Sequence, residues 1–257
     1  MYRYSLLLAV LTLCPMLPAE SSRKSTAPAY TAASVVNSAT NLADALAPNA
    51  IATIYGTDLC YGTSQASSAN IVNRMLPSVL AGVRVYVGGY PASLYYVSPR
   101  QINFLIPEVR PGDMDFFIAR EGTAGPHVRI TVRDVGPGLY QWEQGMIAST
   151  HADGSVLGPA SPAKPGEVII LYGTGFGPAD PPLPNGQLPG APAVLVNPVT
   201  LRMGGVTVRP SFAGLSAAGL YQINAQVPVS APNGDVPVIA TIRGISSPSS
   251  AVIFVQR

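Results

Sequence analysis

The sequence has few charged residues and no cluster of one sign. Asp, Glu, Lys and Arg make up 11% of its 257 residues, and the formal net charge is +2. The 15 Lys and Arg residues form no block and are not interleaved with stacking aromatic residues, as a groove that follows phosphates requires. We therefore expect no nucleic-acid partner. Because hydrophobic residues reach 47%, a chain kept disordered by its charge is also excluded.

Cysteine and histidine are scarce, with two residues of each. Neither His127 nor His151 has metal-ligand spacing with another His, a Cys or a pair of carboxylates, so we predict no metal site there. Both lie next to turn signals, and we interpret them as solvated loop residues. Only a carboxylate and a nucleophile beside one of them would change that interpretation. We interpret Cys60 as a half-buried small apolar residue.

Motifs for nucleotide binding and hydrolysis are incomplete. Gly-Thr-Gly-Phe-Gly at 173–177 has the wrong glycine spacing for a dinucleotide site and leads into Pro178 instead of a helix, so it indicates a strand end turning into a loop. Gly-Leu-Ser-Ala-Ala at 214–218 lacks the final glycine of a nucleophile elbow. We expect Asp113 and Asp115 in a turn, where Asp commonly stabilises the backbone. We predict no catalytic residue and no cofactor, and leave structural calcium open.

Long hydrophobic runs are also missing. No segment reaches the roughly 18 apolar residues of a membrane span. Residues 1–19 instead resemble a secretory signal, with Arg3, a short apolar core and a small residue before the expected cleavage. The protein is therefore expected to be secreted, periplasmic or at the cell surface. The alternative is a lipoprotein anchored through Cys14, although Leu13 occupies a position where such signals have a small residue.

The sequence does contain a long internal repeat. Tyr-Gly-Thr at 55–57 recurs at 172–174, and Gln-Ile-Asn at 101–103 recurs at 222–224. A spacing of roughly 120 residues is too long for a solenoid, so each copy is expected to be a complete domain with its own core.

Both copies have the periodicity of strands. Val83, Val85 and Val87 alternate with Arg84 and Tyr86, and Gly-Gly at 88–89 marks a hairpin turn, as it does at 204–205. Further strand-like runs cover 51–55, 116–119, 128–132, 168–172, 236–242 and 251–255. About seven short strands per copy are typical of an immunoglobulin-like sandwich.

We predict an all-β protein with two tandem immunoglobulin-like sandwiches, at 30–136 and 166–257. An ordered connector at 137–165 would join them, because its apolar residues do not suit a flexible linker. Within it we expect a short strand at 145–149 and a hairpin at Asp153-Gly154.

The order of several motifs resembles a known family. These motifs are Val-Val-Asn at 35–37, Leu-Tyr-Tyr-Val-Ser-Pro at 94–99, Pro-Ala-Lys-Pro-Gly-Glu at 162–167 and Leu-Tyr-Gln-Ile-Asn at 220–224, together with Tyr-Gly-Thr. The chain is similar over residues 30–257 to the Solibacter-type uncharacterised C-terminal domain of exported acidobacterial proteins. The halves of that domain resemble IPT/TIG immunoglobulin-like modules. The resemblance implies architecture and export, and it implies no mechanism.

The candidate contact residues lie in loops and in the repeated motif. The loops at 60–81 and 178–197 occupy equivalent places but differ in composition, as recognition loops on a shared scaffold do. The repeated Gln and Asn side chains either bind a glycan or satisfy backbone groups, and their recurrence favours the structural role. The candidate binding surface comprises Tyr90, Tyr95, Tyr96, Trp142, Gln101, Asn103, Gln222 and Asn224. Half of the aromatic residues can instead belong to a core or a domain interface.

The leading hypothesis is an exported, non-catalytic binding, adhesion or structural module of the bacterial cell envelope or extracellular space. Its partner would be a glycan or another envelope protein. One alternative is a carbohydrate-active or envelope-processing enzyme, which predicts a deep pocket at the domain junction with clustered Asp, Glu or His from the connector. Another alternative is a passive spacer, which predicts no ligand.

Overall fold

The structure is a computed structural model that describes residues 26–257. The expected signal segment and Cys14 lie outside these residues. The described chain is all-β and has no α-helix, with only two short 3-10 turns, η1 (Ala32–Ser34) and η2 (Glu143–Gly145). In this part of the chain no helix is long and apolar enough to cross a membrane.

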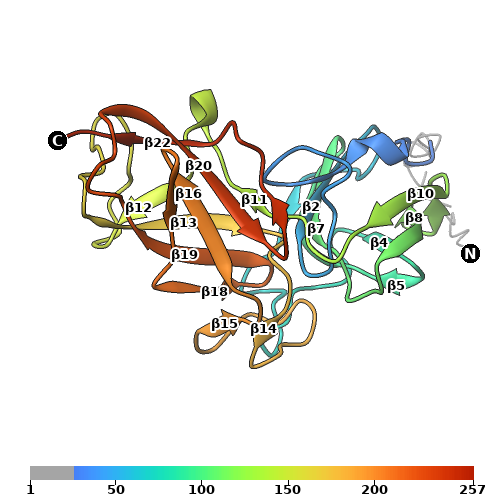
Figure 1. The fold of residues 1–257 in the computed structure, drawn as a ribbon. Coiled ribbons are helices and arrows are strands. Elements are labelled where there is room, and N and C mark those ends of the chain that lie inside the picture. Colours follow the sequence, from blue (N-terminus) through green and yellow to red (C-terminus); the bar gives the residue numbers. More distant parts are fainter. Residues whose placement is uncertain (1–25) are drawn as a thin grey trace, which may run out of the picture.

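The strands form two tandem sandwiches that lie side by side, the first coloured blue to green and the second yellow to red (Figure 1). The first sandwich has two antiparallel sheets. Sheet 1 has the order β1 (Val35–Asn37), β2 (Ile51–Tyr55), β7 (Gln101–Leu105), β6 (Ser93–Val97) and β3 (Ser64–Gln65). Sheet 2 has the order β10 (Val128–Val132), β8 (Gly112–Arg120), β4 (Val83–Val87) and β5 (Tyr90–Pro91), and β9 (Thr123–Ala124) pairs with β8.

The second sandwich repeats this arrangement. Sheet 3 has the order β11 (Gly138–Leu139), β13 (Val168–Thr174), β19 (Leu220–Gln226), β18 (Phe212–Ala217), β15 (Ala193–Leu195) and β14 (Ala179–Asp180), and β12 (Ser149–His151) also pairs with β13. Sheet 4 has the order β17 (Val206–Val208), β16 (Val199–Met203), β20 (Gly234–Ile242) and β21 (Ile245–Ser246), and β22 (Val252–Val255) pairs with β20. The predicted fold class is confirmed.

Each sandwich closes over a core of its own. Val83, Val85 and Val87 are fully buried in the first core, as their alternation predicts, and Leu171 and Ile223 are fully buried in the second. A small third cluster, centred on Leu76, Leu105 and Ala218, lies between the two sandwiches. The hydrophobic faces therefore stabilise two separate units, and apolar contact also joins them.

The hairpin turns form where glycine pairs mark them. Gly88 and Gly89 have φ values of +59° and +84°, and Gly204 and Gly205 have +54° and +87°. These left-handed conformations suit the two-residue turns that join β4 to β5 and β16 to β17.

The residues expected to form a connector add strands to the second sandwich. Both β11 and β12 pair with β13, and Leu139 and Ile147 are buried in the second core. The strand expected at 145–149 starts later, at Ser149, because Glu143–Gly145 forms a 3-10 turn. The hairpin at Asp153-Gly154 is confirmed by the bond from the backbone N–H of His151 to the carbonyl of Ser155.

Candidate functional site

The repeated Gln-Ile-Asn motif forms the same outward-facing amide pair in both sandwiches. It lies on β7 and β19, where the central isoleucine is fully buried and the flanking amides are on the outer face. The Nε2 of Gln101 donates to the Oδ1 of Asn103 at 2.8 Å, and the Nε2 of Gln222 donates to the Oδ1 of Asn224 at 2.8 Å. Within residues 26–257, the Gln Oε1 and the Asn Nδ2 of each pair have no further partner.

Aromatic side chains flank both amide pairs. In each copy one aromatic residue is the cross-strand partner of the Gln, and another is the partner of the Asn. These partners are Tyr55 and Tyr96 in the first sandwich and Tyr172 and Phe212 in the second. Each outer sheet face therefore combines polar amides with flat apolar rings.

The two amide pairs differ in one neighbour. The hydroxyl of Thr53, which is buried, also donates to the Oδ1 of Asn103 at 3.1 Å. The residue in the place of Thr53 in the second sandwich is Ile170, which pairs with Asn224 on β13 and has no hydroxyl to donate. Asn103 therefore has a structural role in the first sandwich, whereas the pair in the second sandwich bonds only within itself.

A shallow trough lies over the amide pair of the second sandwich. One part has a volume of about 540 Å³ and is lined by Gln222, Asn224, Phe212 and the loop 189–192. A second part of about 530 Å³ shares Phe212 and includes Arg209. We call these two parts together the sheet 3 trough. In the described chain, no Asp or Glu lines either part.

The two long loops expected to be recognition loops contact each other. The backbone N–H of Leu76 donates to the carbonyl of Gly186 at 3.0 Å, and the N–H of Leu188 donates to the carbonyl of Arg74 at 2.8 Å. The segments 60–81 and 178–197, expected to be recognition loops, therefore pair with each other at these positions. Their backbones pair across the two sandwiches, and the second loop also forms the wall of the sheet 3 trough.

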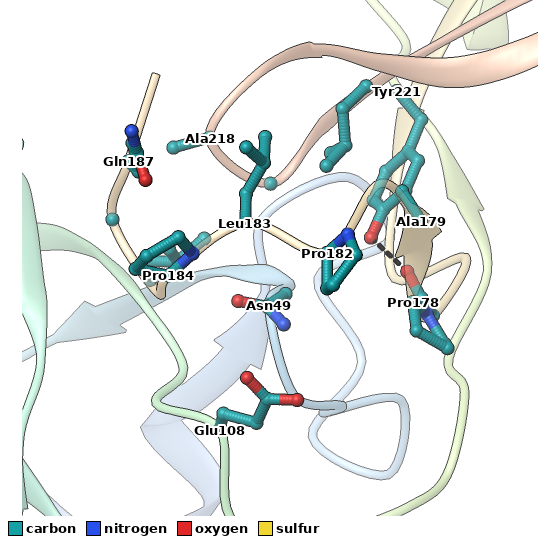
Figure 2. A pocket seen from close by; sticks show the side chains of 15 residues that line it. Asn49, Glu108, Pro178, Ala179, Pro182, Leu183, Pro184, Gln187, Ala218 and Tyr221 are labelled. Carbon is teal, nitrogen blue, oxygen red and sulfur yellow. Dashed lines mark hydrogen bonds between the residues drawn. The ribbon is translucent and has the colours of Figure 1, made fainter. Parts of the chain in front are cut away.

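The domain junction holds a small pocket of about 50 Å³ (Figure 2). Glu108 points into it from the first sandwich, and Tyr221 closes the opposite side, where its hydroxyl donates to the carbonyl of Gly177. Burial raises the pKa of Tyr221. Glu108 is the only acidic side chain among the 15 lining residues, and no His is among them. The pocket has room for a few water molecules, so it is not the deep acidic pocket that the junction-enzyme hypothesis predicts.

His151 lies in a polar cluster within the residues expected to form the connector. Its Nδ1 pairs with the Oε1 of Glu167, and its Nε2 lies 3.1 Å from the Oγ of Ser161 and 3.2 Å from the Ser161 carbonyl. The side chain of His151 is only 16% exposed. The interpretation of His151 as a solvated loop residue is therefore wrong. The bond to Glu167 raises the pKa of His151.

His127 fits its expected description better. Its side chain is 58% exposed, its Nδ1 lies 2.8 Å from the Oδ2 of Asp115, and its ring stacks on Phe117. Asp113 and Asp115 lie on β8 and not in the expected turn, and Asp113 accepts a hydrogen bond from the hydroxyl of Thr131 on β10. Across residues 26–257, no group of three or more His, Cys, Asp or Glu side chains is arranged to hold a metal ion.

The remaining candidate residues are not on one surface. Tyr90 is 61% exposed on β5 of sheet 2, and Trp142 is 46% exposed just before η2. Tyr95 lies between the sandwiches, where its hydroxyl donates to the carbonyl of Ala218. Tyr96 lies beside Asn103. Sequence reasoning missed Phe212 and Arg209, because neither residue belongs to a repeated motif.

The glycines at 173–177 allow two chain segments to approach closely. A Cβ on Gly173 would lie 2.4 Å from the carbonyl oxygen of Gly138, and one on Gly175 would lie 2.0 Å from that of Gly136. These contacts bring the end of β13 against the segment that joins the sandwiches. The interpretation of this motif as a strand end turning into a loop is confirmed.

Cys60 is buried in the first core and lies 3.8 Å from the carbonyl oxygen of Ala81. It is therefore more deeply buried than the half-buried position expected from the sequence. Its contacts are those of a small apolar residue with a weak S–H donor.

No protein-family model and no curated protein matches the chain. Among solved structures, a Bacteroides ovatus SGBP-B from a mixed-linkage glucan utilization locus, in complex with a mixed-linkage heptasaccharide, is 16% identical, with a TM-score of 0.35, over 83% of this chain and 44% of that one. The surface glycan-binding protein PbSGBP-B of Prevotella bryantii is 11% identical, with a TM-score of 0.27, over 86% and 41%. The extracellular region of plexin A4 is 13% identical, with a TM-score of 0.28, over 95% and 20%. The chain thus spans less than half of each, and TM-scores this low carry no argument about function.

Proposed function

We propose that the protein is an exported, non-catalytic binding module of the bacterial cell envelope or extracellular space, and that it binds a glycan in the sheet 3 trough. The observation that carries this proposal is the Gln222–Asn224 pair, which lies in the trough with its Oε1 and Nδ2 free of partners in the described chain. The export signal and the bacterial origin remain expectations from the sequence.

The chemistry of the pair suits neighbouring sugar hydroxyls. A hydroxyl group both donates and accepts, and the pair offers one free acceptor beside one free donor. The internal bond between Gln222 and Asn224 orients both amides before a ligand arrives, which lowers the entropic cost of binding. Phe212, opposite Asn224, supplies an apolar ring against which the carbon face of a sugar can pack.

The shape of the trough supports an extended ligand. Its two parts meet at Phe212 and together exceed the junction pocket many times in volume. An open trough lined by both polar and apolar side chains suits a polymer bound along its length, whereas enclosed catalysis requires a site that excludes water.

The proposal is tested by screening the purified chain against a glycan panel and measuring affinity for each hit. The double variant Gln222→Ala/Asn224→Ala should weaken binding by about tenfold or more, because two sugar hydrogen bonds are lost. Gln101→Ala is the matched control in the first sandwich and should bind as the wild type does. Loss of binding in Gln101→Ala but not in the double variant would contradict the proposal.

A second candidate function is hydrolysis, favoured by the carboxylate–imidazole–hydroxyl order of Glu167, His151 and Ser161. This order matches a nucleophile, its base and an orienting acid. The backbone N–H of Ser161 donates to the carbonyl of Gly158, however, so it is not available to stabilise an oxyanion. Labelling by a fluorophosphonate probe that is lost in Ser161→Ala would favour this candidate. An unlabelled wild-type chain would reject it.

A further inference from the structure

Arg74 brings a positive charge from the first sandwich to the wall of the sheet 3 trough. Its carbonyl accepts a hydrogen bond from the N–H of Leu188 at 2.8 Å, which holds the two loops together. Its guanidinium lies against Gly190, because a Cβ on that glycine would be 2.2 Å from the Nη1 of Arg74. Gly190 lines the part of the trough that contains Gln222 and Asn224. The residues that line the trough all belong to the second sandwich, and Arg74 contacts one of them from the first.

The backbone of Arg74 has a φ of +64°, in the left-handed region that disfavours residues other than glycine. A glycine would adopt this conformation with less strain, yet the position carries a long cationic side chain. Asn73 before it has a φ of +52°, and the two residues form a tight turn that the bond from the N–H of Met75 to the carbonyl of Val72 closes. The left-handed backbone places Arg74 within the loop contact that forms the trough wall.

Arg209 supplies a second positive charge at the other part of the trough. It lines that part with Phe212, which separates it from the amide pair. In the described chain neither Arg74 nor Arg209 takes part in an ion pair or a side-chain hydrogen bond. Two exposed guanidinium groups thus border a trough that no carboxylate lines.

One carboxylate lies on the same face of sheet 3. Asp180 is opposite Val194 at the sheet edge, in the same cross-strand row as Gly214 and Gln222. It lines neither part of the trough. The charge along the trough itself is therefore positive.

We infer that the glycan bound in the trough is anionic, and that Arg74 and Arg209 bind its acidic substituents. This inference rests on the proposed glycan binding by the same trough. A guanidinium group binds a carboxylate or a sulfate through two parallel hydrogen bonds, while the amide pair binds neutral hydroxyls. Uronic acid residues and sulfate esters supply the same anionic chemistry, so the test must separate them.

The test compares affinities within two matched series. Polygalacturonate is compared with its methyl ester, and dextran sulfate with dextran. We expect the wild-type chain to prefer the acidic member of at least one series by about tenfold or more, since each charge-assisted hydrogen bond is worth about that factor. The series in which the preference occurs identifies carboxylate or sulfate as the bound group.

The variants Arg74→Ala and Arg209→Ala should each reduce the preference about tenfold, and Arg74→Lys should restore part of it. Arg84→Ala on sheet 2 removes the same charge far from the trough and should leave the preference intact. Unchanged thermal melting of each variant excludes unfolding as the cause.

The outcomes that overturn only the anionic ligand are distinguishable from the one that also overturns glycan binding. Equal affinity for acidic and neutral members, or an equal effect of Arg84→Ala and Arg74→Ala, would overturn the anionic ligand while leaving glycan binding in place. If the wild-type chain binds no member of either series and no glycan in the wider panel, the proposed function fails together with this inference.

Discussion

Thr174 accepts a hydrogen bond from the backbone N–H of Ile51 at 2.8 Å, so a side chain of the second sandwich pairs with the backbone of the first. The same hydroxyl donates to the carbonyl of Gly219 at 2.7 Å, and Thr174 is fully buried. Nearby, the hydroxyls of Ser38 and Tyr140 lie 2.7 Å apart across the junction. The threonine of the second Tyr-Gly-Thr motif therefore helps to hold the two sandwiches together.

Replacing Thr174 by Val should lower the free energy of unfolding by about 1 to 3 kcal/mol, because the N–H of Ile51 loses its buried acceptor. Thr174→Ser keeps the hydroxyl and should lose less. Chemical denaturation followed by circular dichroism measures both values. Equal stability of the Val variant and the wild type would show that the hydroxyl does not stabilise the junction.

The two Asn residues of the repeat should differ in their effect on stability. Asn103→Ala removes the acceptor of the buried Thr53 hydroxyl and should cost about 1 to 2 kcal/mol. Asn224→Ala leaves no such group unpaired and should change stability by less than about 0.5 kcal/mol. Thermal melts of the two variants make the comparison. A larger loss of stability in Asn224→Ala than in Asn103→Ala would assign the structural role to the second copy.

The pair of His151 and Glu167 should make stability depend on pH. The folded pKa of His151 is raised above its unfolded value of about 6.5. The contribution of the His151–Glu167 pair to the free energy of unfolding is therefore fully present below the unfolded pKa of His151. It is lost as the pH rises through the folded pKa. The wild-type chain should therefore lose this part of its stability as the pH rises above about 6.5 and through the raised folded pKa of His151.

His151→Gln should remove that pH dependence, and His127→Gln is the control with an exposed side chain. Denaturation curves at several pH values measure the difference. If His151→Gln keeps the same dependence as the wild type, the ion pair is not its source.

Gly175 should tolerate no side chain. Its φ is +80°, and a Cβ there would lie 2.0 Å from the carbonyl oxygen of Gly136. Gly175→Ala should therefore destabilise the chain by about 3 kcal/mol or more. Gly154→Ala has a similar φ of +87° and meets no atom within 4 Å, so it should cost only about 1 kcal/mol. Similar melting temperatures for the two variants would contradict this account of the junction.

The architecture was predictable from the sequence because local patterns determine most of it. The alternation of Val83, Val85 and Val87 predicted a half-buried strand, and the Gly-Gly pairs predicted the turns at 88–89 and 204–205. The repeat of whole motifs predicted two cores rather than one. These features depend only on neighbours along the chain or on the duplication itself.

The candidate site depends on contacts between distant residues, which no local pattern reports. His151 and Glu167 come together because β12 pairs with β13. Arg74 reaches Gly190 only because two loops pair across the junction. The repeat located Gln222 and Asn224 but not Phe212 beside them. The repeated Gln-Ile-Asn motif thus predicted that the two amide pairs are equivalent. Only the fold shows that the pair in the second sandwich borders a trough.

The central claim is that the sheet 3 trough is the ligand site. Hydrogen–deuterium exchange with and without a saturating glycan from the panel tests it most directly. We expect slower exchange in peptides that cover 189–192 and 212–224, with no change around residues 151–167. Slower exchange confined to 151–167, or to sheet 2, would contradict it.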